Sequence, residues 1–186
     1  MANSDAPRGF WPLRHLSGGT MRPNAHTIAS GYGTNIFRGD VVKLVAGGGI
    51  EVAAAGDRFL GVFDGCRYVN SSGEQVYSKY WPASTTATEI EAYVYDDPNI
   101  CFGVQSAGST VAADVGNLGD HVAGTGSTTT GISAHELNGS TGTGDAGFRV
   151  IGKIEQPDNA YGTNVNLIVQ PYEHEYAQAD QGTPGV

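Results

Sequence analysis

Few residues of this chain have the type and spacing that chemistry requires. The densest group of potential metal ligands is Glu173-His174-Glu175. Successive side chains of a strand point to opposite faces, so His174 would point away from both glutamates and three ligands would not converge. The other histidines are isolated in the sequence, and we expect them at surface or turn positions: His15, His26, His121 and His135. The sequence predicts neither a metal site nor any other cofactor.

Paired carboxylates occur at Glu89/Glu91 and at Asp96/Asp97. A glycosidase would need such a pair across a sugar-lined cleft, but the first pair lies on the polar face of an alternating segment and the second lies in a turn signal. There is no Gly-x-Ser-x-Gly nucleophile elbow, and the run Ala46-Gly47-Gly48-Gly49 is not followed by the Gly-Lys-Ser/Thr of a phosphate loop. We therefore predict that the protein is not an enzyme.

The charge balance argues against a nucleic-acid partner. The chain has 19 acidic and 10 basic residues, a net charge of −9, whereas DNA binding depends on lysine and arginine. No stretch approaches the ~20 apolar residues of a membrane span, and Met1–Asp5 lacks the basic start and apolar run of a signal peptide. We expect a protein made in a cytoplasm, without a membrane partner, in which Cys66 and Cys101 are buried thiols rather than a disulfide.

The pattern of apolar residues predicts an all-β domain. Two alternating runs on either side of Gly56-Asp57 indicate a β-hairpin, and two further runs around Asp96-Asp97-Pro98-Asn99 indicate a second one. Together with other alternating segments, they predict the walls of a small antiparallel β-barrel: Val41–Val45, Ile50–Ala54, Phe59–Phe63, Glu89–Gln105, Phe148–Ile154 and Val165–Val169.

The chain divides into an arm, a domain and a tail. Residues 24–172 form the predicted barrel domain, within which 124–147 is a Gly/Thr/Ser-rich surface loop, and residues 173–186 form an extended or mobile tail. Residues 1–23 form an extended arm, interrupted by three prolines and without a strand or helix period. Its apolar and basic centre either folds back onto its own domain or lies across another subunit, as tryptophan and arginine often anchor interfaces: Arg8, Phe10, Trp11, Leu13 and Arg14.

Six stretches, taken in order along the chain, resemble the decoration or cement proteins of tailed-phage heads. They are A-N-S-D-A-P-R-G-F at Ala2–Phe10, R-G-D-V-V-K-L-V at Arg38–Val45, A-A-G-D-R-F-L-G-V-F-D-G at Ala54–Gly65, V-Y-D-D-P-N at Val94–Asn99, A-A-D-V-G-N at Ala112–Asn117 and F-R-V-I-G-K at Phe148–Lys153.

The resemblance implies a β-barrel or β-tulip-like domain that forms a homotrimer. Such a protein would bind the major capsid protein on the outside of the phage head and stabilise the head, after being made in the host cytoplasm, and it would have no catalytic residues. Three-fold symmetry would match the local symmetry of a capsid lattice. The arm residues would then form the contact with the capsid or a neighbouring subunit.

A second interpretation is a carbohydrate- or receptor-binding module of a virion fibre. Aromatic faces stack on sugars, and the chain places Tyr77, Tyr80 and Trp81 close together in the sequence.

Overall fold

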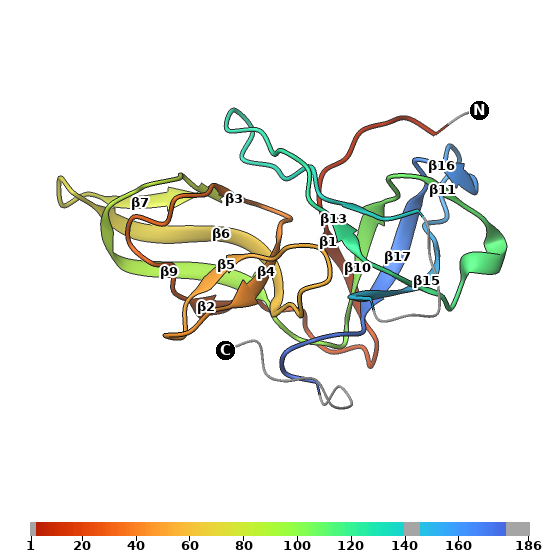
Figure 1. Cartoon of the computed structure of the whole chain (residues 1–186), viewed down its shortest axis with the longest axis horizontal. Coiled ribbons are helices and arrows are strands. Elements are labelled where there is room, and N and C mark those ends of the chain that lie inside the picture. The colour runs from red at the N-terminus through yellow and green to blue at the C-terminus, as the bar shows by residue number, and fades with distance from the viewer. Residues whose placement is uncertain (1–2, 140–145, 178–186) are drawn as a thin grey trace.

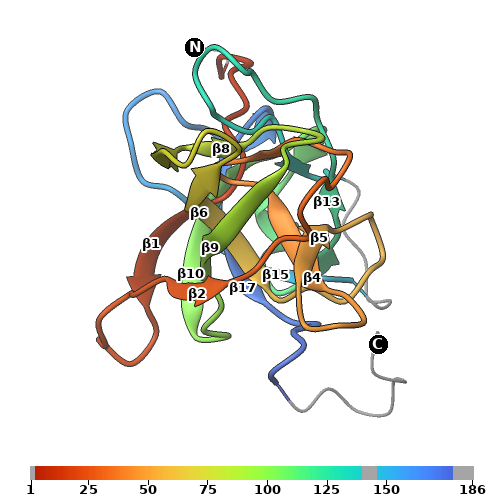
Figure 2. The same ribbon diagram turned by 90° about the vertical axis from the view of Figure 1, so that its left-hand side faces the viewer.

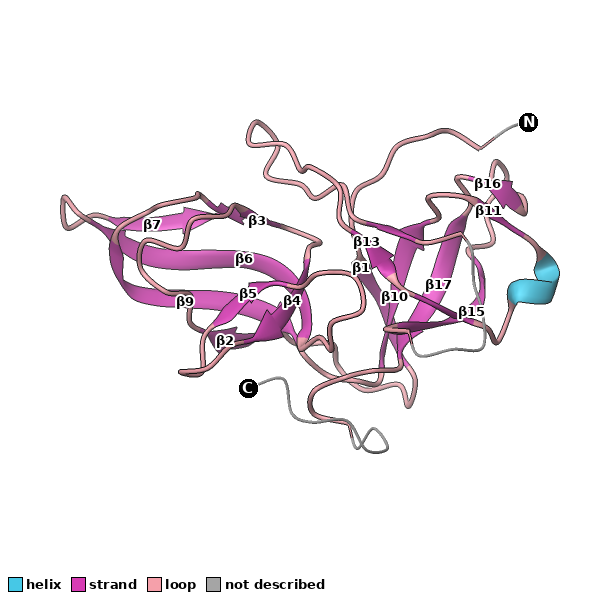
Figure 3. Ribbon diagram, viewed as in Figure 1, coloured by secondary structure: helices cyan, strands magenta, loops and turns pink. Residues whose placement is uncertain are grey.

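The protein is all-β, as the sequence predicts. The computed structural model describes residues 3–139 and 146–177, and its strands form two antiparallel sheets that lie side by side along the long axis of the molecule (Figures 1 and 3). Within these ranges a single 3₁₀ turn, η1 (Ala112–Asp114), is the only helical element. No helix in the same ranges has the length and apolar character needed to cross a membrane.

The first sheet, called sheet A here, has five strands and carries part of the predicted arm at one edge. Its order is β1 (Trp11–His15), β10 (Ile100–Gln105), β17 (Asn166–Pro171), β15 (Phe148–Lys153) and β12 (Leu118–Gly119). The predicted arm therefore contains a strand, although its prolines suggested none. Pro12 is compatible with this position because an edge strand need not donate a hydrogen bond on its outer side.

The second sheet, sheet B, faces the viewer in Figure 2 and contains the longest strands. Its order is β2 (Asn24–His26), β9 (Ala87–Tyr95), β6 (Gly61–Asn70), β4 (Val41–Leu44) and β5 (Ile50–Val52), with β7 (Gln75–Ser78) paired to the far half of β6.

Three two-stranded ribbons complete the fold: β3 (Ile36–Phe37) with β8 (Tyr80–Trp81), β11 (Ser109–Thr110) with β16 (Gly162–Thr163), and β13 (His121–Val122) with β14 (Glu136–Leu137). The strands of the described chain thus lie in separate open sheets and do not close into one barrel, which corrects the predicted barrel geometry.

Neither predicted hairpin forms, because each pair of strands finds other partners. The strands around Gly56-Asp57 both flank β4: β5 pairs with β4, and β4 pairs with β6. Ala53 N–H donates to Val41 O at 3.0 Å and Leu60 N–H donates to Val42 O at 2.8 Å, so both ends of this connection bond to β4. The segment Asp96–Asn99 carries the chain out of sheet B at the end of β9 and into sheet A at β10.

Strands β4 and β6 contribute to both hydrophobic cores of the molecule. Val41 and Val62, which are cross-strand partners, pack in the core of sheet A with Phe102, Phe148 and Val169. Their neighbours Val42 and Phe63 point the other way, into the core of sheet B with Trp81, Ala92 and Val94. Alternation along a strand, which normally separates core from solvent, here separates one core from another.

The start of the predicted tail is packed rather than mobile. His174 is buried, and Glu175 N–H donates to Phe59 O at 3.0 Å. Part of the Gly/Thr/Ser-rich loop is also buried, since His135 and Leu137 are inside the molecule. The remaining tail residues, 178–186, and loop residues 140–145 lie outside the described ranges. Both cysteines are free and buried, as predicted.

Replacing Val62 with aspartate should unfold the protein. A carboxylate at this position would enter the core of sheet A without a partner, at a cost of about 4 kcal/mol or more. Circular dichroism should show loss of the β-sheet signal, and size-exclusion chromatography should show loss of the peak of the folded protein. The matched control Val122→Asp, at an exposed valine, should melt within a few degrees of the parent. A folded Val62→Asp protein would contradict the packing described above.

Candidate functional site: the N-terminal arm and the junction of the two sheets

The arm is fastened to its own domain by the close approach of two glycines. Phe10 N–H donates to Gly39 O at 2.9 Å. Gly9 has φ +73°, and a Cβ at this residue would lie 2.5 Å from Ser133 Cβ. Only glycine combines that conformation with so little space. Farther out, Asn3 donates to the carbonyls of Ala160 and Thr163, both at 2.8 Å, so the arm follows the flank of sheet A.

Phe10 is a core residue and does not belong to an interface. Its side chain is 2% exposed. Its ring stacks on Phe148 with a centroid distance of 4.6 Å, and Phe148 stacks on Phe59 at 4.4 Å. Of the two interpretations of the arm, folding back onto its own domain is the correct one for Phe10.

Trp11 and Arg8 meet on the outside of sheet A. Trp11 pairs with Gly103 across the β1–β10 ladder, and its indole lies against that glycine: a Cβ there would be 2.3 Å from the ring. The guanidinium carbon of Arg8 lies 3.8 Å from the centroid of the Trp11 ring, a cation–π arrangement. Trp11 is therefore partly buried, since its ring lies against Gly103 and beside the Arg8 guanidinium.

Leu13 and Arg14 lie on the open edge of sheet A. The register shifts between Pro12 and Arg14, which makes Leu13 the extra residue of a bulge. Leu13 is half-buried and Arg14 is exposed. Neither Arg8 nor Arg14 forms an ion pair with any other residue of the described chain.

A pocket of about 290 Å³ lies where β1 faces the ends of β6 and β9. Arg8 and Trp11 line one side, and Tyr95 lines the other together with Arg38 and Asp64. Arg38 Nε donates to Asp64 Oδ1 at 2.7 Å, which fixes both side chains. The sequence did not indicate these last three residues, because they come from segments that only the tertiary fold brings to the arm.

The four isolated histidines were wrongly expected at surface or turn positions. His121 and His135 are buried, while His15 and His26 are mostly covered and bond to Asp97 and Asp96 at 3.0 and 2.9 Å. His174, in the predicted tail, is buried as well. The isolation of these four histidines in the sequence did not indicate whether they are exposed, because each of them bonds to a residue that is distant in the sequence.

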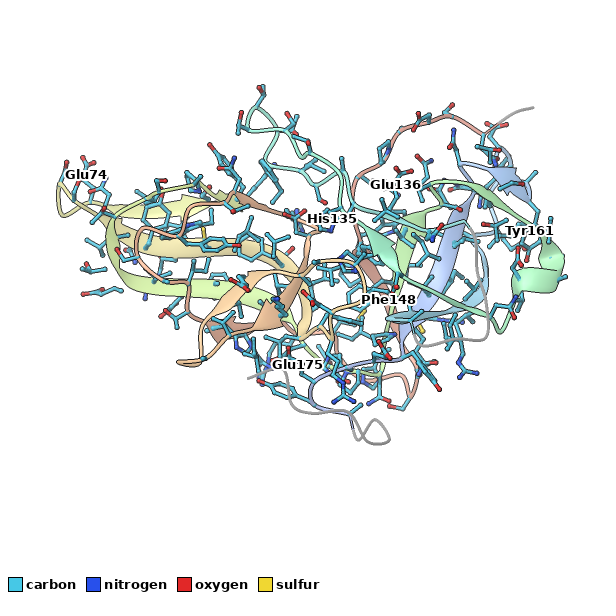
Figure 4. The ribbon with its side chains drawn as sticks, in the orientation of Figure 1. Glu74, His135, Glu136, Phe148, Tyr161 and Glu175 are labelled. Carbon is cyan, nitrogen blue, oxygen red and sulfur yellow. The ribbon has the colours of Figure 1, made fainter. Side chains whose placement is uncertain are left out.

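His135 lies at the junction of the two sheets (Figure 4) and stacks on His121 at 5.6 Å. Val41 N–H donates to His135 Nδ1 at 3.4 Å, so the neutral imidazole carries its proton on Nε2, which lies 3.4 Å from Asp40 Oδ1. Burial lowers the pKa of His135 to about 3 and raises that of Asp40 to about 6, partly offset for Asp40 by hydrogen bonds from Ser133 and Phe37 N–H.

Ser133, His135 and Asp40 are the residue types of a hydrolytic triad, but their geometry does not make one. The Ser133 oxygen accepts from the backbone N–H of His135 at 2.9 Å, and within the described chain no hydrogen bond joins it to the imidazole. All three residues are buried. In a triad the base must bond to the nucleophile. Among residues 3–139 and 146–177, no group of three or more histidine, cysteine or acidic side chains is arranged to hold a metal.

Comparison with protein-family models, with curated proteins and with solved structures finds no match to this chain. The site is therefore interpreted from its own geometry. The fold places Arg8, Trp11 and Arg14 at one outer edge. Arg38, Asp64 and Tyr95 line the pocket next to Arg8 and Trp11, whereas Phe10 is buried in the core.

Replacing Gly103 with alanine should displace Trp11. The new methyl group would overlap the indole, and overpacking of this kind costs about 1–3 kcal/mol. Tryptophan fluorescence reports the change directly, since the other tryptophan, Trp81, is buried elsewhere. We expect a red shift and increased quenching by acrylamide. The control Gly152→Ala, also in sheet A, has open space at its Cβ position and should leave the spectrum unchanged. An unchanged spectrum in Gly103→Ala would show that Trp11 does not rest on Gly103.

Acid should destabilise the protein through His174, whose pKa burial lowers to about 4. An unfolded histidine takes up its proton near pH 6.5, so the unfolded state binds more protons as pH falls, and stability is lost between about pH 6.5 and pH 4. Between pH 7 and pH 5 this contribution is about 2 kcal/mol. His174→Gln should reduce the loss of unfolding free energy over this interval by that amount, measured by urea titration. Equal pH dependence in His174→Gln and the parent would rule out the buried neutral imidazole.

Proposed function

We propose that the protein is a structural component of a tailed-phage head, a decoration or cement protein. In this proposal three copies bind the outside of the capsid through contacts with the major capsid protein, and they stabilise the head. The protein would be made in the host cytoplasm and would reside on the capsid exterior.

The observation that carries the proposal is the cluster of Arg8, Trp11 and Arg14 on an open sheet edge. The chain has a net charge of −9, yet this edge presents two exposed arginines that form no ion pair within the described residues, next to a partly buried tryptophan. Tryptophan and arginine are the residues that most often dominate binding energy at interfaces. The cluster has no role in either hydrophobic core, so its composition is explained by a partner.

Two further features support the proposal. The six stretches that resemble decoration proteins include the arm and span most of the chain. The arm is fixed to a rigid sheet by Gly9, Phe10 and β1, so its outward side chains are already positioned, which lowers the entropy cost of binding.

The alternative of a fibre module that binds sugars through Tyr77, Tyr80 and Trp81 receives no support from these three residues as a group. Trp81 is 0% exposed and Tyr80 stacks on Phe37 at 5.5 Å. Only Tyr77 projects into solvent, so the three rings do not form one binding face.

Charge-removing variants can test the arm without unfolding it. Deletion of residues 2–14 is unsuitable, because it would remove Phe10 from the core and β1 from sheet A. The double variant Arg8→Ala/Arg14→Ala should bind phage heads that lack this protein at least about tenfold more weakly, because each arginine at an interface centre contributes on the order of 1 kcal/mol or more. Co-sedimentation with purified expanded heads measures the loss.

The matched control is Arg58→Ala/Arg149→Ala, which removes the same charge elsewhere and should bind like the parent. Equal binding by the two double variants would show that the arm edge is not the contact. Failure of the unaltered protein to bind any heads, and its absence from a map of the virion head, would refute the decoration function itself.

A further inference from the structure

The outer face of sheet B carries a hollow with a different composition from the arm edge. The hollow measures about 260 Å³ and lies over β6 between Tyr77 of β7 and Tyr93 of β9. Gly65 is opposite Tyr93 in the ladder, and Arg67 is opposite Tyr77 on one side and Glu91 on the other. These side chains all project from the face opposite to the Cys66, Ala92 and Val94 core.

The hollow exists because Gly65 has no side chain. Its φ is +155°, and a Cβ at this position would lie 2.9 Å from Ser78 O. The backbone of β6 is therefore bare at Gly65, and the two tyrosines, on the strands to either side, line the hollow together with Asp64 and Lys79. Tyr77 is 71% exposed, so most of its ring is accessible to a ligand.

The polar groups beside the hollow are held in fixed positions by one another. Arg67 donates two hydrogen bonds to Glu91, Nε to Oε2 at 3.1 Å and a terminal nitrogen to Oε1 at 2.6 Å, and the Tyr93 hydroxyl donates to Glu91 Oε2 at 2.9 Å. Only two of the five guanidinium N–H donors are used in these bonds, and each carboxylate oxygen keeps acceptor capacity. The group thus presents oriented donors and acceptors, and its charges cancel.

We infer that this hollow is an oligosaccharide-binding site. A pyranose ring has an apolar C–H face that stacks on an aromatic ring and hydroxyl groups at its edge that need oriented donors and acceptors. Tyr77 and Tyr93 provide the rings, and Asp64, Ser78 and Lys79 provide polar groups in the lining. The Arg67–Glu91 pair lies one step farther along β6 and β9 and adds donors and acceptors beside it. The volume is just below the roughly 300–1,000 Å³ of drug-sized ligand sites, which suits one or two sugar rings.

The composition of the hollow favours a sugar over a protein partner. The centre of a protein interface is desolvated, which would leave the Asp64 carboxylate and the Lys79 ammonium in need of partners, whereas the hydroxyl groups of a sugar can bond to both. The lining is Asp64, Gly65, Cys66, Tyr77, Ser78, Lys79 and Tyr93. The inference does not depend on the decoration function, since the hollow and the arm edge are formed by different residues apart from Asp64.

The test is a printed array of bacterial-surface, plant and animal glycans, followed by calorimetric titration of the strongest hit. Tyr77→Ala and Tyr93→Ala should each weaken binding by about tenfold or more, because each loses a stacking ring. Tyr77→Phe keeps the ring and should retain most of the affinity. The control Tyr176→Ala removes another exposed tyrosine, which is 56% exposed in the parent, and should bind as the parent does, as should Arg8→Ala/Arg14→Ala.

Absence of any glycan hit for the parent protein would overturn the inference, as would equal binding by Tyr77→Ala and the parent. If Tyr77→Ala lost binding to phage heads and no glycan bound, the face would be a protein interface and the sugar site would be wrong. The two proposals therefore fail independently: Arg8 and Arg14 report on the heads, and Tyr77 and Tyr93 report on the glycan.

Discussion

The fold depends on two neighbouring strands, β4 and β6, that pack on a different core on each face. Val41 and Val62 face one core, while Val42 and Phe63 face the other. This arrangement requires β9 to approach β6 very closely, and Gly61 makes that possible: a Cβ there would lie 2.2 Å from Tyr95 O. Since neither core can be completed without these strands, the two sheets form one cooperative unit, with His135 and Asp40 buried at their junction.

This constraint also determines what the arm can do. The turn that begins β4 places Gly39 under Gly9 and sends Phe10 onto Phe148. The arm thereby becomes part of the core that β4 helps to form, and Trp11 and Arg8 are left facing outward. An arm that is half core and half surface cannot be removed as a unit, so folding and binding can be separated only at individual side chains.

The sequence predicted the strands well and their partners poorly. Alternation is local, and it predicted the strands over Glu89–Tyr95 and Ile100–Gln105 that form β9 and β10. Pairing depends on the global fold, so the turn signals at Gly56-Asp57 and Asp96–Asn99 suggested hairpins that do not form. The first turn joins two strands that lie on either side of β4, and the second joins a strand of sheet B to a strand of sheet A. The same limit applies to the site. Arg8 and Trp11 could be selected by type, but Arg38, Asp64 and Tyr95 join them only through tertiary contacts, and three of the five histidines are buried by segments distant in sequence.

The surfaces that remain for function are those that the two cores do not use. At one end of the outer face of sheet B, Asp64 borders the pocket beside Arg8 and Trp11, and it also borders the hollow between Tyr77 and Tyr93. Asp64 is a residue of strand β6, and its ion pair with Arg38 at 2.7 Å fixes the position of its carboxylate. A ligand in the hollow and a partner on the arm would therefore meet preformed surfaces a short distance apart. Both proposed surfaces are built on strands that are anchored in the cores, so occupation of one would require no rearrangement of the strands that form the other.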